Sequence, residues 1–87
     1  MQRSVVVALP EGLHARPAAQ FVVAAGRLPV KVTIAKTGGT PVATASILAI
    51  MTLGVGAGDE VVLATDDDGA DAVASIDALE QFLLQTA

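Results

Sequence analysis

The stretch GLHARPAA, residues 12–19, joins a predicted strand to a predicted helix. His14 stands where the chain turns, at or near the N-cap of that helix, and Ala15 and Arg16 then occupy its first turn. The backbone N–H groups of a first helical turn have no acceptor inside the helix. Pro17 has no N–H and is tolerated at such a position. The stretch therefore predicts a helix start at which His14 lies beside free N–H groups of Ala15 and Arg16.

The elements on either side of this stretch follow from local patterns. Ser4–Leu9 is rich in valine and predicts a strand, which ends at Pro10. Ala15–Ala25 predicts a helix, with Gly26 as its C-terminal stop. The apolar residues at helical spacing in this helix are Ala18, Phe21, Val22 and Ala25.

The middle of the chain predicts a hairpin followed by a short helix. Val30–Lys36 alternates between apolar and polar residues, as a half-buried strand does. Gly38-Gly39 is a hairpin signal, and Thr40–Thr44 is the returning strand. The short helix follows this hairpin and runs to about Leu53.

Ser46 is the expected N-cap of this short helix, and Gly54 ends it. Glu60–Thr65 is the fourth predicted strand. Asp68 is the expected N-cap of the last helix, which runs from Ala70 to about Leu84. The apolar stripe of that last helix consists of Val73, Ile76, Leu79 and Leu83.

The resulting order of elements is β-α-β-β-α-β-α within one domain, residues 1–87. It predicts an α+β fold in which four strands form one mainly antiparallel sheet and helices cover one face of that sheet.

Composition excludes several classes of function. The net charge of −4 and the aromatic content of 2% make nucleic acid an unexpected partner. The chain has no cysteine and a single histidine, so we expect no disulfide, no zinc site and no cofactor. The longest uncharged run, Thr37–Gly58, is interrupted by Pro41 and several glycines, which argues against membrane insertion. A soluble, cytoplasmic protein is the expectation.

The start of the first helix is suited to bind an anion. A phosphoryl group on the His14 ring would lie at the positive end of the helix dipole. Arg16 adds a permanent cation that can donate several N–H bonds to phosphate oxygens. Histidine suits reversible phosphorylation because one ring nitrogen is a free nucleophile near neutral pH. A plain loop histidine beside a solvated arginine would show the same residues, so the residues alone leave both interpretations open.

Residues 12–22, reading GLHARPAAQFV, closely resemble the active-site segment of the HPr family, the histidine-containing phosphocarriers of the sugar phosphotransferase system. The element order and residues 45–54, reading ASILAIMTLG, resemble that family too. The resemblance implies an open-faced β-sandwich with three helices on one side of the sheet. It also implies that His14 accepts a phosphoryl group on Nδ1 from Enzyme I, which phosphoenolpyruvate charges, and passes it to sugar-specific IIA proteins. Arg16 would steady the phosphoryl group, and the chain would be a stoichiometric carrier and not an enzyme.

Ser46 has two interpretations. Its position alone explains it as a helix N-cap. In HPr proteins of many Gram-positive bacteria, HPr kinase/phosphorylase phosphorylates the matching serine, which weakens phosphotransfer and creates a binding surface for a catabolite-control transcription regulator. Ile47 and Met51 resemble those members. The resemblance therefore makes regulatory phosphorylation of Ser46 an expectation, and the start of a helix favours it electrostatically.

The short helix also carries a patch that one helix of this length cannot hide completely. The patch consists of Ile47, Leu48 and Met51. We interpret it as a docking surface beside His14, because this helix and the first one contact Enzyme I and the IIA proteins in the HPr family. The alternative is that these side chains only cover a core formed by Ile50 and Leu53.

Arg27 and Gly54 complete the expected docking surface. Many HPr members carry several lysines on the first helix, whereas this chain has Val22, Val23 and Ala24 there. Electrostatic steering should therefore be weaker, and association should depend more on apolar contact. A monomer is the simplest expectation for a carrier that docks two partners with one face.

The alternative function is a regulatory binding module of the same fold, in a nitrogen-linked or other paralogous phosphotransferase chain. The presence of His14 argues against a purely regulatory paralogue that has lost the carrier histidine. A hydrolytic enzyme would need a second catalytic group near His14, and the sequence offers none.

Overall fold

A computed structural model describes residues 1–86. These residues form four strands and three helices in the predicted order β-α-β-β-α-β-α. The elements are β1 (Gln2–Val6), α1 (Ala15–Gly26), β2 (Thr33–Lys36), β3 (Val42–Ala43), α2 (Ile47–Leu53), β4 (Glu60–Ala64) and α3 (Ala70–Leu83).

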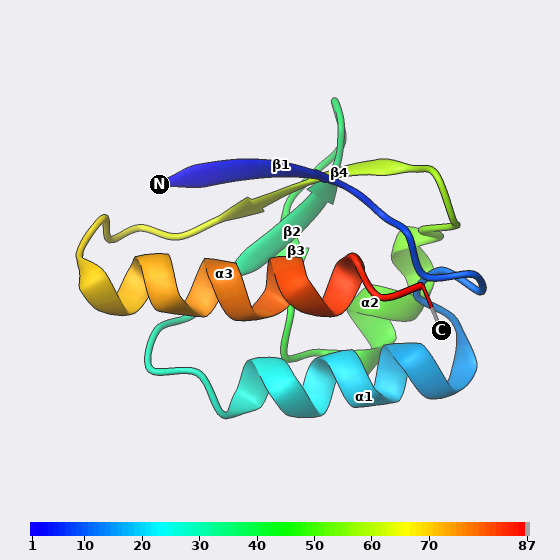
Figure 1. Ribbon diagram of the computed structural model, residues 1–87, viewed down its shortest axis with the longest axis horizontal. Coiled ribbons are helices and arrows are strands. Elements are labelled where there is room, and N and C mark those ends of the chain that lie inside the picture. Colours follow the sequence, from blue (N-terminus) through cyan, green and yellow to red (C-terminus); the bar gives the residue numbers. More distant parts are fainter. Residues whose placement is uncertain (87) are drawn as a thin grey trace.

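The strands form one sheet in the order β1-β4-β2-β3, and each neighbouring pair is antiparallel. The register of β1 against β4 runs from Gln2 opposite Ala64 to Val6 opposite Glu60. The helices lie together on one side of the sheet, with α1 and α3 side by side (Figure 1). The predicted α+β fold, an open-faced sandwich, is confirmed.

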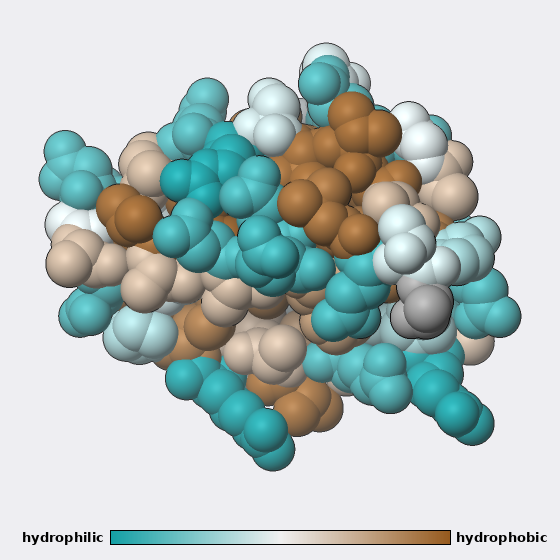
Figure 2. All heavy atoms as spheres, viewed as in Figure 1, coloured by the Kyte–Doolittle hydropathy of each residue, from teal (hydrophilic) through white to brown (hydrophobic). Residues whose placement is uncertain are grey.

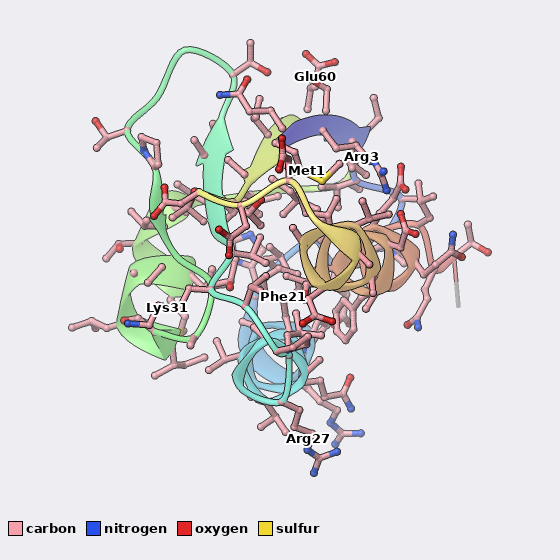
Figure 3. The ribbon with its side chains drawn as sticks, turned by 90° about the vertical axis from the view of Figure 1, so that its left-hand side faces the viewer. Met1, Arg3, Phe21, Arg27, Lys31 and Glu60 are labelled. Carbon is pink, nitrogen blue, oxygen red and sulfur yellow. The ribbon has the colours of Figure 1, made fainter. Side chains whose placement is uncertain are left out.

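The core lies between the sheet and the helices. Val61 and Leu63 of β4 are fully buried, while the residues that alternate with them are not. Phe21 of α1 points into this interior (Figure 3), and its ring meets the ring of Phe82 edge to face at 5.4 Å. Other fully buried side chains are Leu13, Ile34, Ile50, Ile76, Leu79 and Leu83. Each of these aliphatic side chains contributes roughly 1.5–3 kcal/mol through its transfer from water.

The first strand differs from its predicted range. β1 covers Gln2–Val6 and not Ser4–Leu9. The ladder with β4 ends at Val6 opposite Glu60, and Val7 is still hydrogen-bonded to Asp59 and Gly58, which precede β4. The chain then turns toward the helices, and the Ala8 N–H donates to the Leu83 carbonyl at 2.8 Å. The contact that ends the strand is therefore distant in sequence.

The hairpin strands are shorter than predicted. β2 begins three residues late, at Thr33, and β3 keeps only Val42–Ala43 of the expected Thr40–Thr44. Just beyond the paired residues, the N–H and the hydroxyl of Thr44 both donate to the Val32 carbonyl, at 3.1 and 2.7 Å, so contact between the two segments continues past the strand ends.

Two helix ends also differ from the prediction. Gly69, and not Asp68, is the N-cap of α3, because the Val73 N–H donates to the Gly69 carbonyl at 3.1 Å. α1 includes Gly26 and is capped by the next residue in a right-handed conformation, so no left-handed glycine ends it. By contrast, Gly54 ends α2 as predicted, and its φ of +72° makes it a left-handed cap.

The buried face of α3 is rotated relative to the predicted stripe. Ile76, Leu79 and Leu83 are buried as predicted, but Val73 is 37% exposed. Ala72 and Ser75 are buried in its place. The buried face of α3 thus includes two small side chains that the predicted stripe did not contain.

The outer surface is mixed in character. Figure 2 shows a cluster of apolar side chains near the end of β1, with polar side chains around it. The last residue of β1, Val6, is 55% exposed. In residues 1–86 no helix is long and apolar enough to cross a membrane.

Candidate functional site

The loop that carries His14 packs against the segment that follows α2. The Leu13 N–H donates to the Val55 carbonyl at 3.0 Å, and both side chains are fully buried. Gly12 has φ +65°, and a Cβ there would lie 2.4 Å from the Val55 oxygen and 2.6 Å from the Gly56 Cα. Only glycine fits this position, because both the backbone conformation and the space exclude a side chain.

His14 is the N-cap of α1, as predicted. Its backbone is extended, with φ −122° and ψ 155°, and its carbonyl accepts the Ala18 N–H at 3.4 Å. The imidazole makes no capping hydrogen bond, and the residue is exposed. The ring is therefore free to meet a partner from solvent.

Ala15 has a conformation that local patterns did not predict. Its φ of +47° lies in the left-handed region, which is unusual for a residue with a side chain. Such a conformation costs roughly 1–2 kcal/mol and has to be held by its surroundings. Among residues 1–86, the N–H groups of Ala15 and Arg16 find no hydrogen-bond acceptor. Two donors thus remain free next to the His14 ring.

Arg16 is exposed and takes part in no ion pair within the described chain. It follows His14 by two residues in the same helical turn, so its guanidinium remains available to an anion. No group of three or more His, Cys, Asp or Glu residues in positions 1–86 could hold a metal ion. The arrangement at the start of α1 suits an anion bound to or near a histidine ring.

The second predicted site lies at the start of α2. Ser46 is the N-cap, and its Oγ accepts the Ala49 N–H at 3.3 Å, which confirms the capping interpretation. Ile50 is buried beneath the helix. The three patch side chains are exposed, by 41% at Ile47, 74% at Leu48 and 50% at Met51.

α1 also exposes apolar surface. α1 packs against α2, and Val23 of α1 is 54% exposed. A shallow hollow of about 320 Å³ lies on α1, lined by Ala19, Gln20, Val23, Ala24 and Arg27. Figure 3 shows Arg27 projecting from α1 away from the sheet. The surface thus combines exposed aliphatic side chains with one cation at its end.

A family model described as the PTS HPr component phosphorylation site matches residues 1–85. The chain belongs to the HPr family. The phosphocarrier protein HPr of Streptomyces coelicolor is 55% identical over 71 residues, which cover 82% of this chain and 76% of that one. Members of the HPr family are phosphocarrier components of the phosphotransferase system. The family that the sequence resembles is therefore confirmed as the family of this chain.

Solved structures agree with this assignment. The crystal structure of HPr from Bacillus anthracis matches with a TM-score of 0.86 and 38% identity, and the match covers 95% of each chain. A further relative is the HPr-like protein Crh of Halalkalibacterium halodurans, which is 37% identical over 83 residues and covers 95% of each chain. The relatives of this chain therefore include proteins named HPr and a protein named Crh.

Proposed function

We propose that this chain carries a phosphoryl group on His14 from phosphorylated Enzyme I to sugar-specific IIA proteins. The observation that supports the proposal is the exposed, uncommitted imidazole at the N-cap of α1, next to the free N–H groups of Ala15 and Arg16. In this proposal the protein is a stoichiometric carrier in the cytoplasm that needs no cofactor and has no turnover of its own.

The transfer is an exchange of one nitrogen for another at phosphorus. The Nδ1 lone pair of neutral His14 attacks the phosphorus of the Enzyme I phosphohistidine. A new N–P bond forms while the old one breaks, and the electron pair of the broken bond stays on the Enzyme I imidazole. The IIA histidine later repeats this attack, and the pair returns to His14. Because the bonds made and broken are of one kind, the exchange is nearly balanced in free energy and readily reversible.

The start of α1 supplies what this chemistry needs. Phosphoryl transfer depends mainly on positioning and on stabilising charge that spreads over the phosphoryl oxygens. The N–H groups of Ala15 and Arg16 donate to these oxygens at the positive end of the helix dipole. The Arg16 guanidinium donates a further, charge-assisted pair of hydrogen bonds.

Both partners would dock on the surface that borders His14. That surface comprises the α2 patch of Ile47, Leu48 and Met51, together with Arg27 and Gly54. Exposed aliphatic side chains of this size favour association when a partner covers them. A single docking face lets a monomer serve Enzyme I and a IIA protein in turn.

The test is the intact mass of the protein after incubation with phosphoenolpyruvate and an Enzyme I that demonstrably phosphorylates its own HPr. We expect one acid-labile phosphoryl group on the wild type, none on His14→Ala, and one on Ser46→Ala. An unchanged wild-type mass under these conditions would reject the carrier function.

A regulatory role through Ser46 is a second candidate. It is supported by the half-buried Oγ that caps α2 beside the exposed patch, and by the Crh relative. A phosphate at this N-cap would keep an acceptor for the Ala49 N–H and gain from the helix dipole. It would also bring about two negative charges to the docking surface. HPr kinase/phosphorylase would add it, and a catabolite-control transcription regulator would read it.

This candidate is tested with purified HPr kinase/phosphorylase and ATP. We expect an acid-stable phosphoryl group on the wild type and on His14→Ala, but none on Ser46→Ala. A kinase that is active on its own HPr and leaves this wild type unmodified would exclude the regulatory role.

A further inference from the structure

The loop between α2 and β4, residues 54–59, is the support on which the His14 loop rests. It provides the Val55 carbonyl that accepts the Leu13 N–H at 3.0 Å. It also provides the Gly56 backbone, which lies so close to Gly12 that a Cβ would be 2.6 Å from the Gly56 Cα. Any movement of this support is passed on to Leu13, the residue directly before His14.

The carboxylate of Asp59 closes the support loop on itself. Its Oδ2 accepts the Gly56 N–H at 2.8 Å, and the Asp59 N–H donates back to the Gly56 carbonyl at 3.1 Å. The Asp59 carbonyl accepts the N–H of Val7, the residue that follows β1, at 2.9 Å. The hydrogen bond from Gly56 lowers the pKa of Asp59, so the acceptor is ionised at neutral pH.

Lys36 ties the same loop to the sheet. It is the last residue of β2, and its Nζ donates to the Gly54 carbonyl at 3.1 Å and lies 3.5 Å from Asp59 Oδ2. Gly54 is the C-cap of α2, where a cation also complements the negative end of the helix. One lysine therefore connects the end of the docking helix α2 with the carboxylate that shapes the support loop.

We propose that Lys36 and Asp59 are positioning residues for phosphoryl transfer at His14, an inference that rests on the proposed carrier function. They act through the chain of contacts from Asp59 to Gly56 and Val55, and from Val55 to Leu13. Neither residue needs to touch the phosphoryl group.

The exposure of the pair separates this role from simple stabilisation. The side chains of Lys36 and Asp59 are 43% and 41% exposed, and such ion pairs add little to global stability. The geometry of transfer, however, is sensitive to displacements of an ångström or less. Removing Asp59 should therefore affect transfer far more than unfolding.

The chain offers a matched control on the far side of the molecule. Arg3 of β1, which Figure 3 labels, pairs with Asp77 and Glu80 of α3, and Asp77 is exposed like Asp59. Asp77→Ala removes a surface carboxylate from an ion pair that has no contact with the support loop. Asp59→Asn keeps an amide oxygen that can accept the Gly56 N–H and removes only the charge.

The experiment measures kcat and KM for transfer from phosphorylated Enzyme I, and the hydrogen exchange of the Leu13 amide by NMR. For Asp59→Ala we expect kcat to fall about tenfold with KM nearly unchanged, because positioning and not docking is lost. The Leu13 amide should exchange about tenfold faster, since local opening governs its protection. Lys36→Met should change both quantities in the same direction, while Asp59→Asn and Asp77→Ala stay within about twofold of wild type.

The inference would be overturned if Asp59→Ala kept the wild-type kcat, or if Asp77→Ala lowered kcat as much as Asp59→Ala does. It would also be overturned if Asp59→Asn were as impaired as Asp59→Ala. If the wild type accepts no phosphoryl group, the carrier function fails. The Leu13 exchange then decides separately whether Asp59 holds the loop, and unchanged exchange in Asp59→Ala rejects that too.

Discussion

Gly12 and Gly56 lie in backbone contact, so that a Cβ on Gly12 would stand 2.6 Å from the Gly56 Cα. Gly12→Ala must shift one of the two loops and must also hold alanine at φ +65°. We expect it to lower the free energy of unfolding by about 2 kcal/mol or more, and to displace the residues that precede His14. Urea unfolding followed by circular dichroism measures the loss.

A second glycine provides the control for this prediction. Gly26 lies in the last turn of α1, and a Cβ there would meet nothing within 4 Å. Gly26→Ala should raise the free energy of unfolding by about 0.5 kcal/mol, because alanine is the better helix former. Equal effects of the two substitutions would show that the contact with Gly56 is not what restricts Gly12.

Arg16 should be sensitive to substitution even by lysine. Arg16→Lys keeps the charge but loses the planar fork that donates two parallel bonds to a phosphoryl group. We expect the rate constant of phosphoryl transfer to fall about tenfold, which corresponds to about 1.4 kcal/mol. Single-turnover transfer from phosphorylated Enzyme I measures it. Arg3→Lys makes the same replacement in β1, outside the proposed docking surface, and should leave the single-turnover rate unchanged. A loss there as large as at Arg16 would contradict the assigned role.

Ser75 buries a hydroxyl that has no hydrogen-bond partner in residues 1–86. Ser75→Ala removes an unsatisfied polar group from α3 and should raise the free energy of unfolding by about 1 kcal/mol. Thr44→Val removes a buried hydroxyl that is satisfied, because the Thr44 hydroxyl donates to the Val32 carbonyl at 2.7 Å. It should lower the free energy of unfolding by about 1 kcal/mol. Thermal unfolding of both variants tests the pair, and a destabilised Ser75→Ala would mean that the hydroxyl is satisfied in solution.

The pH dependence of stability should show a small contribution from Asp59. The hydrogen bond from Gly56 lowers its pKa below the ordinary value of 3.8. A group with a lowered pKa in the folded state stabilises the fold above the unfolded pKa, and this contribution disappears as the pH falls through the folded pKa. The stability difference between wild type and Asp59→Asn should therefore shrink below about pH 4. The midpoints of urea unfolding, measured for both proteins from acid to neutral pH, give this stability difference. A difference that does not change with pH would contradict the lowered pKa of Asp59.

Local sequence patterns were sufficient to predict several features of this chain. The N-cap positions of His14 and Ser46 and the left-handed Gly54 depend on residues within about one helical turn. The burial of Phe21 and Ile76 follows from spacing along a single helix. The order of elements was correct for the same reason, since each depends mainly on its own pattern.

Local sequence patterns did not predict some of the strand ends, or the N-cap of α3, correctly. β1 ends at Val6, whose partner in β4 is Glu60, a residue far away in sequence. The N-cap of α3 moved from Asp68 to Gly69, although both residues fit the local pattern. Capping preferences limit the N-cap of a helix to a few neighbouring residues. The packing of the helix then selects one of these residues.

The sequence by itself determined the elements, their order and the helix start that presents His14, because these depend on propensities and caps within a few residues. Only the tertiary structure decided the strand order β1-β4-β2-β3, the left-handed Ala15 and the contact of the His14 loop with residues 55–56. It also decided that Lys36 and Asp59 meet behind that loop. These features join residues that are far apart along the chain, and no local periodicity or composition encodes such a contact.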